Sequence, residues 1–158
     1  MTHKRIRIGM VGGGDGAFIG AVHRIATRID DGYELVAGAL SSDPNRALSS
    51  ARRLGIADER SYSSFSAMAK QEKKRKDGIQ AVIIVTPNHM HYPVAKAFLE
   101  QGIHVICDKP VTKDLSEALE LKKLVTKSGA FFALTHNYTG YPLVRHAKHL
   151  VDSDVLGK

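Results

Sequence analysis

The sequence predicts an α/β fold, a doubly wound parallel sheet with helices on both faces. Short apolar runs alternate with segments of helical periodicity along the chain, which is typical of this class. The run 81–85 is continuously apolar and mostly β-branched, as expected for a central parallel strand that is covered on both faces. A glycine-rich segment, residues 12–16, connects the first strand to the first helix. In such sheets crossovers are right-handed, and ligands bind beyond the carboxyl ends of the strands.

The length and composition predict one globular domain. The chain has 158 residues, enough to bury a core without disulfides or metals, and 43% of them are hydrophobic and 25% charged. Cys107 is the single cysteine, and the first residues do not resemble a secretory leader. No apolar run approaches the roughly 20 residues that span a bilayer. These features predict a cytoplasmic protein that does not engage a membrane.

The net charge of +7 is a reason to consider a nucleic-acid partner. A good share of the excess lies in residues 70–76, which we predict to be a solvated helix end or loop. The sequence has no recognition-helix signature, zinc-ligand spacing or aromatic–basic motif, so we expect neither nucleic-acid binding nor a metal site. A diffuse positive field also suits an anionic dinucleotide.

Five strands are predicted from the short apolar runs. Turn-forming residues bound them: the glycine segment ends the first strand, residues 30–32 precede the second, and Gly102 and Gly129 precede the last two. The predicted strands are residues 6–11, 33–40, 81–85, 103–107 and 130–135.

Six helices are predicted where apolar residues recur at helical spacing. In the first helix these residues are Ile19, Val22, Ile25, Ala26 and Ile29. The third helix is more polar than the others, and the fifth is amphipathic. The predicted helices are residues 18–29, 44–54, 64–74, 91–100, 115–127 and 141–151.

Several helix ends carry recognisable signals. Asp43 is placed to cap the second helix, with Pro44 in its first turn and Gly55 after its end. The fifth helix has two candidate caps, Asp114 and Thr112.

The glycine segment is the first candidate binding site. Glycines allow a sharp turn and close approach of a pyrophosphate, while the first turn of the next helix offers unpaired N–H groups and a partial positive charge. The segment resembles the G-x-G-x-x-G fingerprint of Rossmann-type folds, whose third glycine is either replaced by Ala17 or supplied by Gly20 after a longer loop. Asp15 would repel phosphate unless it points away. The expected cofactor contacts here are Gly12, Gly13, Gly14, Gly16, Phe18 and Ile19.

The end of the second strand bears on the choice between NAD and NADP. An acidic residue usually binds the ribose hydroxyls of NAD at this point, but Ser41 occupies the position. Asp43 comes two residues later, where a helix cap is expected. Ser41, Ser42 and Arg46 could instead accept a 2′-phosphate, so the sequence predicts NAD or NADP without choosing between them.

Two further segments follow the third and fourth predicted strands. They are Thr86-Pro-Asn-His-Met-His91 and Asp108-Lys-Pro110. With the glycine turn, His23 and Asn137-Tyr138, they make the chain resemble the glucose-fructose oxidoreductase/inositol dehydrogenase group, the Gfo/Idh/MocA oxidoreductases. The resemblance covers residues 6–158. Each motif alone is weak, and their combination is specific.

The resemblance implies roles for these residues. Thr86, Pro87 and Asn88 would pack on the cofactor, and His91 would lie near the nicotinamide, although a buried histidine that bonds to the backbone is the alternative. Asp108 replaces the glutamate of the family motif, and Asn137 would also contact the cofactor. Lys109 would be the catalytic residue that polarises or deprotonates a sugar hydroxyl. Partly buried beside a cationic nicotinamide, it would suit proton transfer. The Lys109–Pro110 bond is often cis in this family.

The resemblance also implies that residues 1–158 are the dinucleotide-binding domain of a longer oxidoreductase. The second, α+β substrate domain of the family would be absent, so these residues alone are not expected to catalyse. The longer protein would transfer hydride between NAD or NADP and a sugar, cyclitol or related polyol, and would be a homo-oligomer. A non-catalytic dinucleotide-binding or redox-sensing module is the alternative. A methyltransferase on a similar fold is disfavoured, because Thr86-Pro-Asn and Lys109-Pro have no role there.

Overall fold

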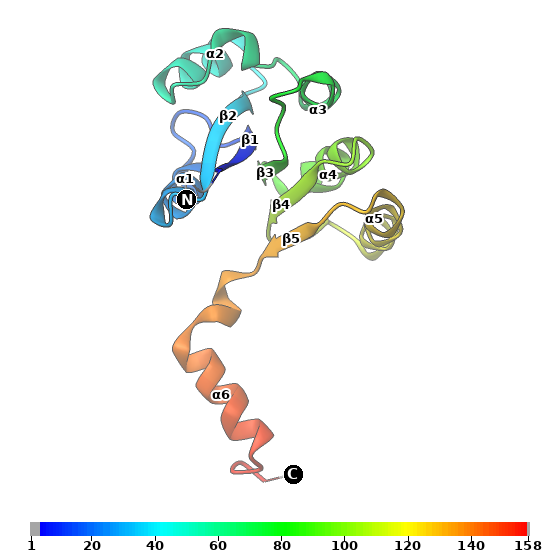
Figure 1. Cartoon of the computed structure of the whole chain (residues 1–158). Coiled ribbons are helices and arrows are strands. Elements are labelled where there is room, and N and C mark those ends of the chain that lie inside the picture. The colour runs from blue at the N-terminus through cyan, green and yellow to red at the C-terminus, as the bar shows by residue number, and fades with distance from the viewer. Residues whose placement is uncertain (1–3, 158) are drawn as a thin grey trace.

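The chain forms one five-stranded parallel sheet with the strand order β2-β1-β3-β4-β5 (Figure 1). The computed structural model describes residues 4–157. All four strand pairings are parallel. The strands are β1 (Ile6–Gly12), β2 (Tyr33–Ala39), β3 (Ala81–Val85), β4 (His104–Asp108) and β5 (Phe132–Thr135). The strand order reverses between β1 and β3, so a crevice beyond their carboxyl ends is the expected binding place.

Each predicted helix is present within one residue of its expected bounds, and each strand within two. The helices are α1 (Phe18–Ile29), α2 (Pro44–Arg53), α3 (Phe65–Lys74), α4 (His91–Leu99), α5 (Leu115–Ser128) and α6 (Pro142–Asp152). Short 3-10 turns lie at η1 (Asp58–Arg60), η2 (Asn88–Met90) and η3 (Asn137–Gly140). The predicted α/β class and single sheet are therefore confirmed.

The expected caps are found. Asp43 accepts a hydrogen bond from the backbone N–H of Arg46 at 2.8 Å. At the start of α5, Asp114 accepts from the N–H of Glu117 at 2.9 Å, so Asp114 rather than Thr112 is the cap. These bonds satisfy backbone donors that have no partner within the helix.

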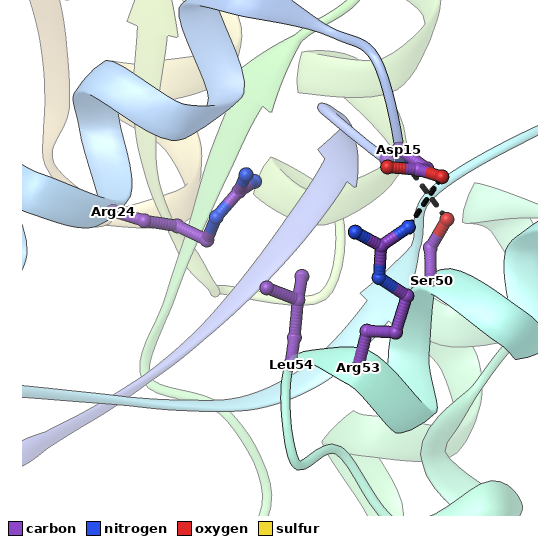
Figure 2. Close-up of a pocket in the computed structure, with 6 residues that line it drawn as sticks. Asp15, Arg24, Ser50, Arg53 and Leu54 are labelled. Atoms are coloured by element: carbon purple, nitrogen blue, oxygen red, sulfur yellow. Dashed lines mark hydrogen bonds and ion pairs between the residues drawn. The ribbon is translucent and has the colours of Figure 1, made fainter.

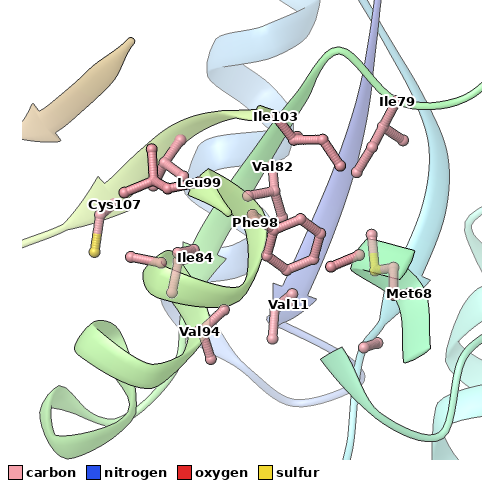
Figure 3. Close-up of a cluster of buried hydrophobic side chains, with 14 of the residues drawn as sticks. Val11, Met68, Ile79, Val82, Ile84, Val94, Phe98, Leu99, Ile103 and Cys107 are labelled. Atoms are coloured by element: carbon pink, nitrogen blue, oxygen red, sulfur yellow. The ribbon is translucent and has the colours of Figure 1, made fainter. Parts of the chain in front are cut away.

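Apolar side chains fill both sides of the sheet. On one side, Phe98 of α4 and Met68 of α3 are fully buried against Val82 and Ile84 of β3 (Figure 3). On the other side, α1 and α2 cover a smaller cluster that includes Ile83. All five residues of β3 are buried. Coverage of both faces is what the continuous apolar run predicts.

Helix α1 turns most of its predicted apolar stripe away from the sheet, whereas Ile19 is partly buried against the cluster that includes Ile83. Phe18, Val22, Ile25 and Ile29 are 82%, 42%, 63% and 74% exposed. Gly20 is the buried residue of this helix. The helical spacing therefore identifies the element correctly, whereas the side that packs on the sheet is set by the close approach of Gly20 to the loop before it.

The charged run 70–76 differs from the prediction at Glu72, whose side chain is completely buried. Glu72 lies on the same face of α3 as Met68 and Ala69, which places it in the core. Arg60 donates to its two carboxylate oxygens at 3.1 and 2.5 Å, and Tyr62 donates to it at 2.8 Å. Burial and the neighbouring carboxylate raise the pKa of Tyr62. The rest of the run is partly or fully exposed, as predicted.

Helix α6 extends away from the sheet, as Figure 1 shows. It has no buried residue. Within residues 4–157, no helix is long and apolar enough to cross a membrane.

Candidate functional site

The glycine loop after β1 has a backbone that only glycine readily adopts. Gly12, Gly13 and Gly16 have φ values of +78°, +71° and +76°. A Cβ on Gly20 would lie 2.5 Å from the Cα of Gly13. Gly20, not Ala17, therefore has the close-packing role of the third fingerprint glycine, after a loop lengthened by three residues.

Contacts with β2 and α2 hold the far end of this loop. The N–H of Gly14 donates to the carbonyl of Leu40 at 3.2 Å. The N–H of Asp15 donates to the Ser50 hydroxyl at 3.0 Å, and its carboxylate pairs with Arg53 at 2.6 Å (Figure 2). Asp15 is thus directed towards α2 and paired with a cation, which removes its expected conflict with phosphate.

Arg24 is a residue of this site that sequence reasoning missed. It reaches back from α1 and donates to the carbonyl of Gly13 at 2.7 Å. It lines a pocket of about 150 Å³ together with Asp15 and Arg53 (Figure 2). Burial, and then the charge of Arg28, lower the pKa of Arg24. The sequence does contain a signal for Arg24, which lies one turn after Gly20 on the same side of α1.

The segment after β2 lies beside the glycine loop. Arg46 donates to the carbonyl of Asp15 at 2.6 Å. The Ser41 hydroxyl accepts from the N–H of Asp43 at 3.2 Å, and Ser42 is exposed. Asp43 caps α2, as described above. The structure therefore brings Ser41, Ser42 and Arg46 to the edge of the sheet where the glycines lie.

The loops after β3 and β4 meet at His91, which is 1% exposed. Its Nδ1 lies 2.5 Å from the carbonyl oxygen of Pro110, and its Nε2 lies 3.0 Å from that of Thr86. The backbone-bonded alternative is what the structure shows, while contact of His91 with a cofactor stays a prediction. Pro87 and Asn88 are exposed beside it.

The Thr86 hydroxyl is buried and, within the described part of the chain, has no hydrogen-bond partner. Such an orphaned group normally has a partner in the functional state. Its place in the loop after β3 agrees with a ligand that orders this loop.

The loop after β4 carries Asp108 and Lys109. Asp108 accepts from the Thr135 hydroxyl of β5 at 2.9 Å. Lys109 is exposed, which differs from the partly buried position expected for it, because the turn projects beyond the end of β4. The Lys109–Pro110 peptide bond is cis, as the resemblance implies.

A second pocket, of about 240 Å³, lies between α1 and the ends of β4 and β5. Its polar lining consists of His23, Asp108, Thr135 and Asn137. Burial lowers the pKa of His23, and the Asp108 carboxylate opposes this shift. The pocket joins Asn137, which is distant in sequence, to the Asp108 loop.

Charge is unevenly placed along the helices that pack on the sheet. Each of α1–α5 has a basic residue in its last turn, and only α5 has an acidic residue in its first. The first turn of α1 also lacks a side-chain cap. Its N–H groups and its dipole are therefore free of a competing carboxylate, as binding of an anionic group requires.

These features fit a dinucleotide. The positive-φ glycines, the close packing of Gly13 on Gly20, the uncapped α1 and the orphaned Thr86 hydroxyl lie on three neighbouring segments of one sheet edge. A metal site has no comparable basis: residues 4–157 contain no group of three or more His, Cys, Asp or Glu side chains placed to hold an ion.

Comparison with known families agrees with this geometry. The model of the Gfo/Idh/MocA family, described as "Oxidoreductase family, NAD-binding Rossmann fold", matches residues 6–136. The chain belongs to this family. The match includes the glycine loop, the Thr86-Pro-Asn segment and the Asp108-Lys-Pro turn, so the Gfo/Idh/MocA resemblance and its NAD-binding fold are confirmed.

Individual relatives show how far the similarity extends. The Bacillus subtilis (strain 168) protein "Uncharacterized oxidoreductase YfiI" is 37% identical over 98% of this chain and 39% of its own length. An oxidoreductase structure from Sinorhizobium meliloti is 61% identical, with a TM-score of 0.87, over 98% of this chain and 43% of that one.

A structure of an inositol dehydrogenase homolog from Azotobacter vinelandii, complexed with NADH and myo-inositol, is 37% identical with a TM-score of 0.92. It is matched over 98% of this chain and 41% of its own. The chain thus spans about two-fifths of the length of these relatives.

Proposed function

We propose that residues 1–158 form the coenzyme-binding domain of a Gfo/Idh/MocA oxidoreductase that transfers hydride between NAD or NADP and a sugar, cyclitol or related polyol. The observation that carries the proposal is the placement of the glycine loop and the Lys109 turn at the same edge of the sheet. The relative that binds NADH and myo-inositol supports the choice of coenzyme and of substrate class.

Different segments of the chain would bind different parts of the coenzyme. N–H groups of the glycine loop and of Phe18 and Ile19 would hold the pyrophosphate. Ser41, Ser42 and Arg46 would bind the adenosine ribose or its 2′-phosphate, since arginine suits phosphate geometry.

On the reactive side, Thr86 to Asn88, Asp108 and Asn137 would surround the nicotinamide ring. The bound nicotinamide supplies the hydride acceptor or donor. Lys109 would accept the proton of the substrate hydroxyl as the carbon–hydrogen bond breaks, and would return it in the reverse direction.

Fluorescence titration with NADH and NADPH tests the coenzyme proposal. We expect binding of at least one coenzyme. An Arg46→Ala variant should weaken NADPH more than NADH if Arg46 contacts the 2′-phosphate. Gly13→Ala should abolish binding, because its Cβ would lie 2.8 Å from both Met10 Sδ and Val85 Cγ2. Failure of the unmodified chain to bind either coenzyme would overturn the proposal.

The proposed role of Lys109 in turnover can be tested separately from coenzyme binding. Absorbance at 340 nm with NAD⁺ or NADP⁺ and a panel of polyols should show no turnover by these 158 residues alone. In a longer form that does turn over, Lys109→Ala should abolish activity while keeping NADH affinity. Full activity of that variant would remove Lys109 from the mechanism, and coenzyme binding without polyol turnover in any form would favour a sensing module.

A further inference from the structure

We propose that His91 is a positioning residue that fixes the Lys109 turn by hydrogen-bonding the Pro110 carbonyl to the start of α4. The inference rests on the proposed function, in which Lys109 moves the substrate proton. In this role His91 does not touch the substrate. It acts on Lys109 through the main chain of the turn.

The sheet itself does not hold these loops together. Pairing of β3 with β4 ends at Ile84 and Cys107, two and three residues before Thr86 and Pro110. Beyond that point the His91 ring lies between the two loops, with Nδ1 next to the Pro110 carbonyl oxygen and Nε2 next to that of Thr86. A neutral ring has one N–H and can therefore donate to only one of them. A carbonyl oxygen can only accept, so the ring must act as a donor.

The shorter contact, from Nδ1 to the Pro110 carbonyl at 2.5 Å, assigns the ring proton to Nδ1. Pro110 directly follows Lys109. The ring is 1% exposed, at the first residue of α4, and α4 is anchored in the core by Val94 and Phe98. The histidine therefore connects the turn to a rigid element rather than to another loop alone.

Lys109 depends on this anchor because its own side chain is not held. Among residues 4–157, its Nζ makes no hydrogen bond or ion pair, and the residue is exposed. The position of its main chain therefore decides where the amine can reach. A displacement of about 1 Å at a catalytic group can cost on the order of 100-fold in rate.

Three substitutions separate the two contacts. His91→Asn places an amide near the position of Nδ1 and keeps a donor for Pro110. His91→Gln places its amide near Nε2, where a donor can reach Thr86 but not Pro110. His91→Leu fills the space without either donor. If His91 only filled the core, the polar variants would differ in stability but not in their effect on Lys109.

His104 provides the control, because it is a half-buried histidine that also bonds to the backbone. Its Nδ1 accepts from the N–H of Phe131 at 3.0 Å, at the amino end of β4 and thus far from the Lys109 turn. His104→Leu should lower the melting temperature and leave Lys109 unaffected.

The measurement is the NMR signal of the Lys109 side-chain ε-methylene, assigned by its loss in Lys109→Arg, with and without NAD⁺. Hydrogen exchange of the Lys109 and Val111 amides and NADH affinity accompany it. In wild type and His91→Asn, the Lys109 signal should respond equally to NAD⁺.

In His91→Gln and His91→Leu that response should be lost, and exchange at Lys109 and Val111 should rise at least about tenfold. NADH affinity is recorded separately, because the His91 ring also contacts Thr86, a proposed coenzyme contact. A wild-type response in all three variants, or its loss in His104→Leu, would overturn the positioning role. Failure of wild type to bind NAD⁺ or NADH would instead refute the proposed function.

Discussion

At the scale of single residues, the site requires glycines, because a side chain at these positions would clash with neighbouring atoms. Gly20 shows this best, since its Cα hydrogens face the Cα and carbonyl of Gly13 across the start of α1. The sequence left open whether Ala17 or Gly20 had this part. Spacing alone could not decide, because the length of a loop with several positive-φ glycines follows from contacts that lie outside the loop.

Gly20→Ala should distort the loop. The new Cβ would lie 2.5 Å from Gly13 Cα, so we expect a loss of about 1–3 kcal/mol of stability and a clear loss of NADH affinity. Urea unfolding and NADH fluorescence measure the two effects. Gly32→Ala is the control, because a Cβ there meets no atom within 4 Å. Equal behaviour of the two variants would contradict the close-packing role.

Glu72→Gln should strongly destabilise the chain. It removes the carboxylate that accepts two hydrogen bonds from Arg60, whose side chain is 8% exposed and keeps the longer ion pair with Asp77 at 3.6 Å. Breaking a buried ion pair from one side typically costs about 3–5 kcal/mol. The matched variant Asp58→Asn breaks the exposed pair with Arg52 and should change the unfolding midpoint little. Similar midpoints for both variants would contradict the prediction.

His23 should make stability depend on pH. Burial lowers its pKa below the ordinary 6.5, so below that pH the unfolded chain takes up the proton first. Stability should therefore fall as pH decreases from 6.5 and stop falling, for this group, once the folded form is protonated as well. Urea unfolding between pH 5 and pH 8 (roughly one unit or more on each side of the ordinary value) measures this. An unchanged pH slope in His23→Gln would exclude His23 as the source.

At the scale of elements, periodicity and turn residues predict helices and strands well, but not which side of a helix is buried. Every strand and helix follows from apolar spacing, caps and glycines. The inward position of Glu72 and the outward apolar stripe of α1 do not. Both depend on partners from other parts of the chain. Arg60 and Tyr62 bind the Glu72 carboxylate. Gly13 packs closely on Gly20, which places the glycine face of α1 against the sheet.

The candidate site was predictable to the same extent. The segments follow from their positions after strands, and Asp43 and Gly12 to Gly16 from local chemistry. The roles of Arg24 and His91 required the structure, since each bonds to a carbonyl whose direction is set by the fold.

The burial of β4 predicts an unreactive Cys107. This thiol is completely buried, and desolvation followed by the nearby Asp108 charge raises its pKa to about 12. We expect slow reaction with a thiol reagent such as DTNB at neutral pH, and rapid reaction in denaturant. Fast labelling of the folded chain would show that β4 opens readily at the Asp108 end.

At the scale of the whole molecule, the sheet and α1–α5 form the packed core and α6 lies outside it. Helix α6 has no buried residue, although Tyr138 and Tyr141 stack edge-to-face at its start, with ring centroids 5.7 Å apart. The helix therefore contributes little apolar burial to the stability of the sheet.

Removal of residues 141–158 should leave the melting temperature within about 2 °C of the starting chain. Calorimetry of the two forms tests this, and NADH titration should give the same affinity for both. A large drop in melting temperature would show that α6 contacts the sheet in solution.

The uneven charge of the helices has a practical consequence for handling the protein. Basic side chains gather at the amino ends of the strands, where Arg7, Lys73 and Lys76 line a common pocket. A negatively charged support should therefore adsorb the molecule by that end and leave the carboxyl edge open to solution. Immobilisation on a cation exchanger would in this way present every copy in the same orientation, with its crevice accessible to small molecules.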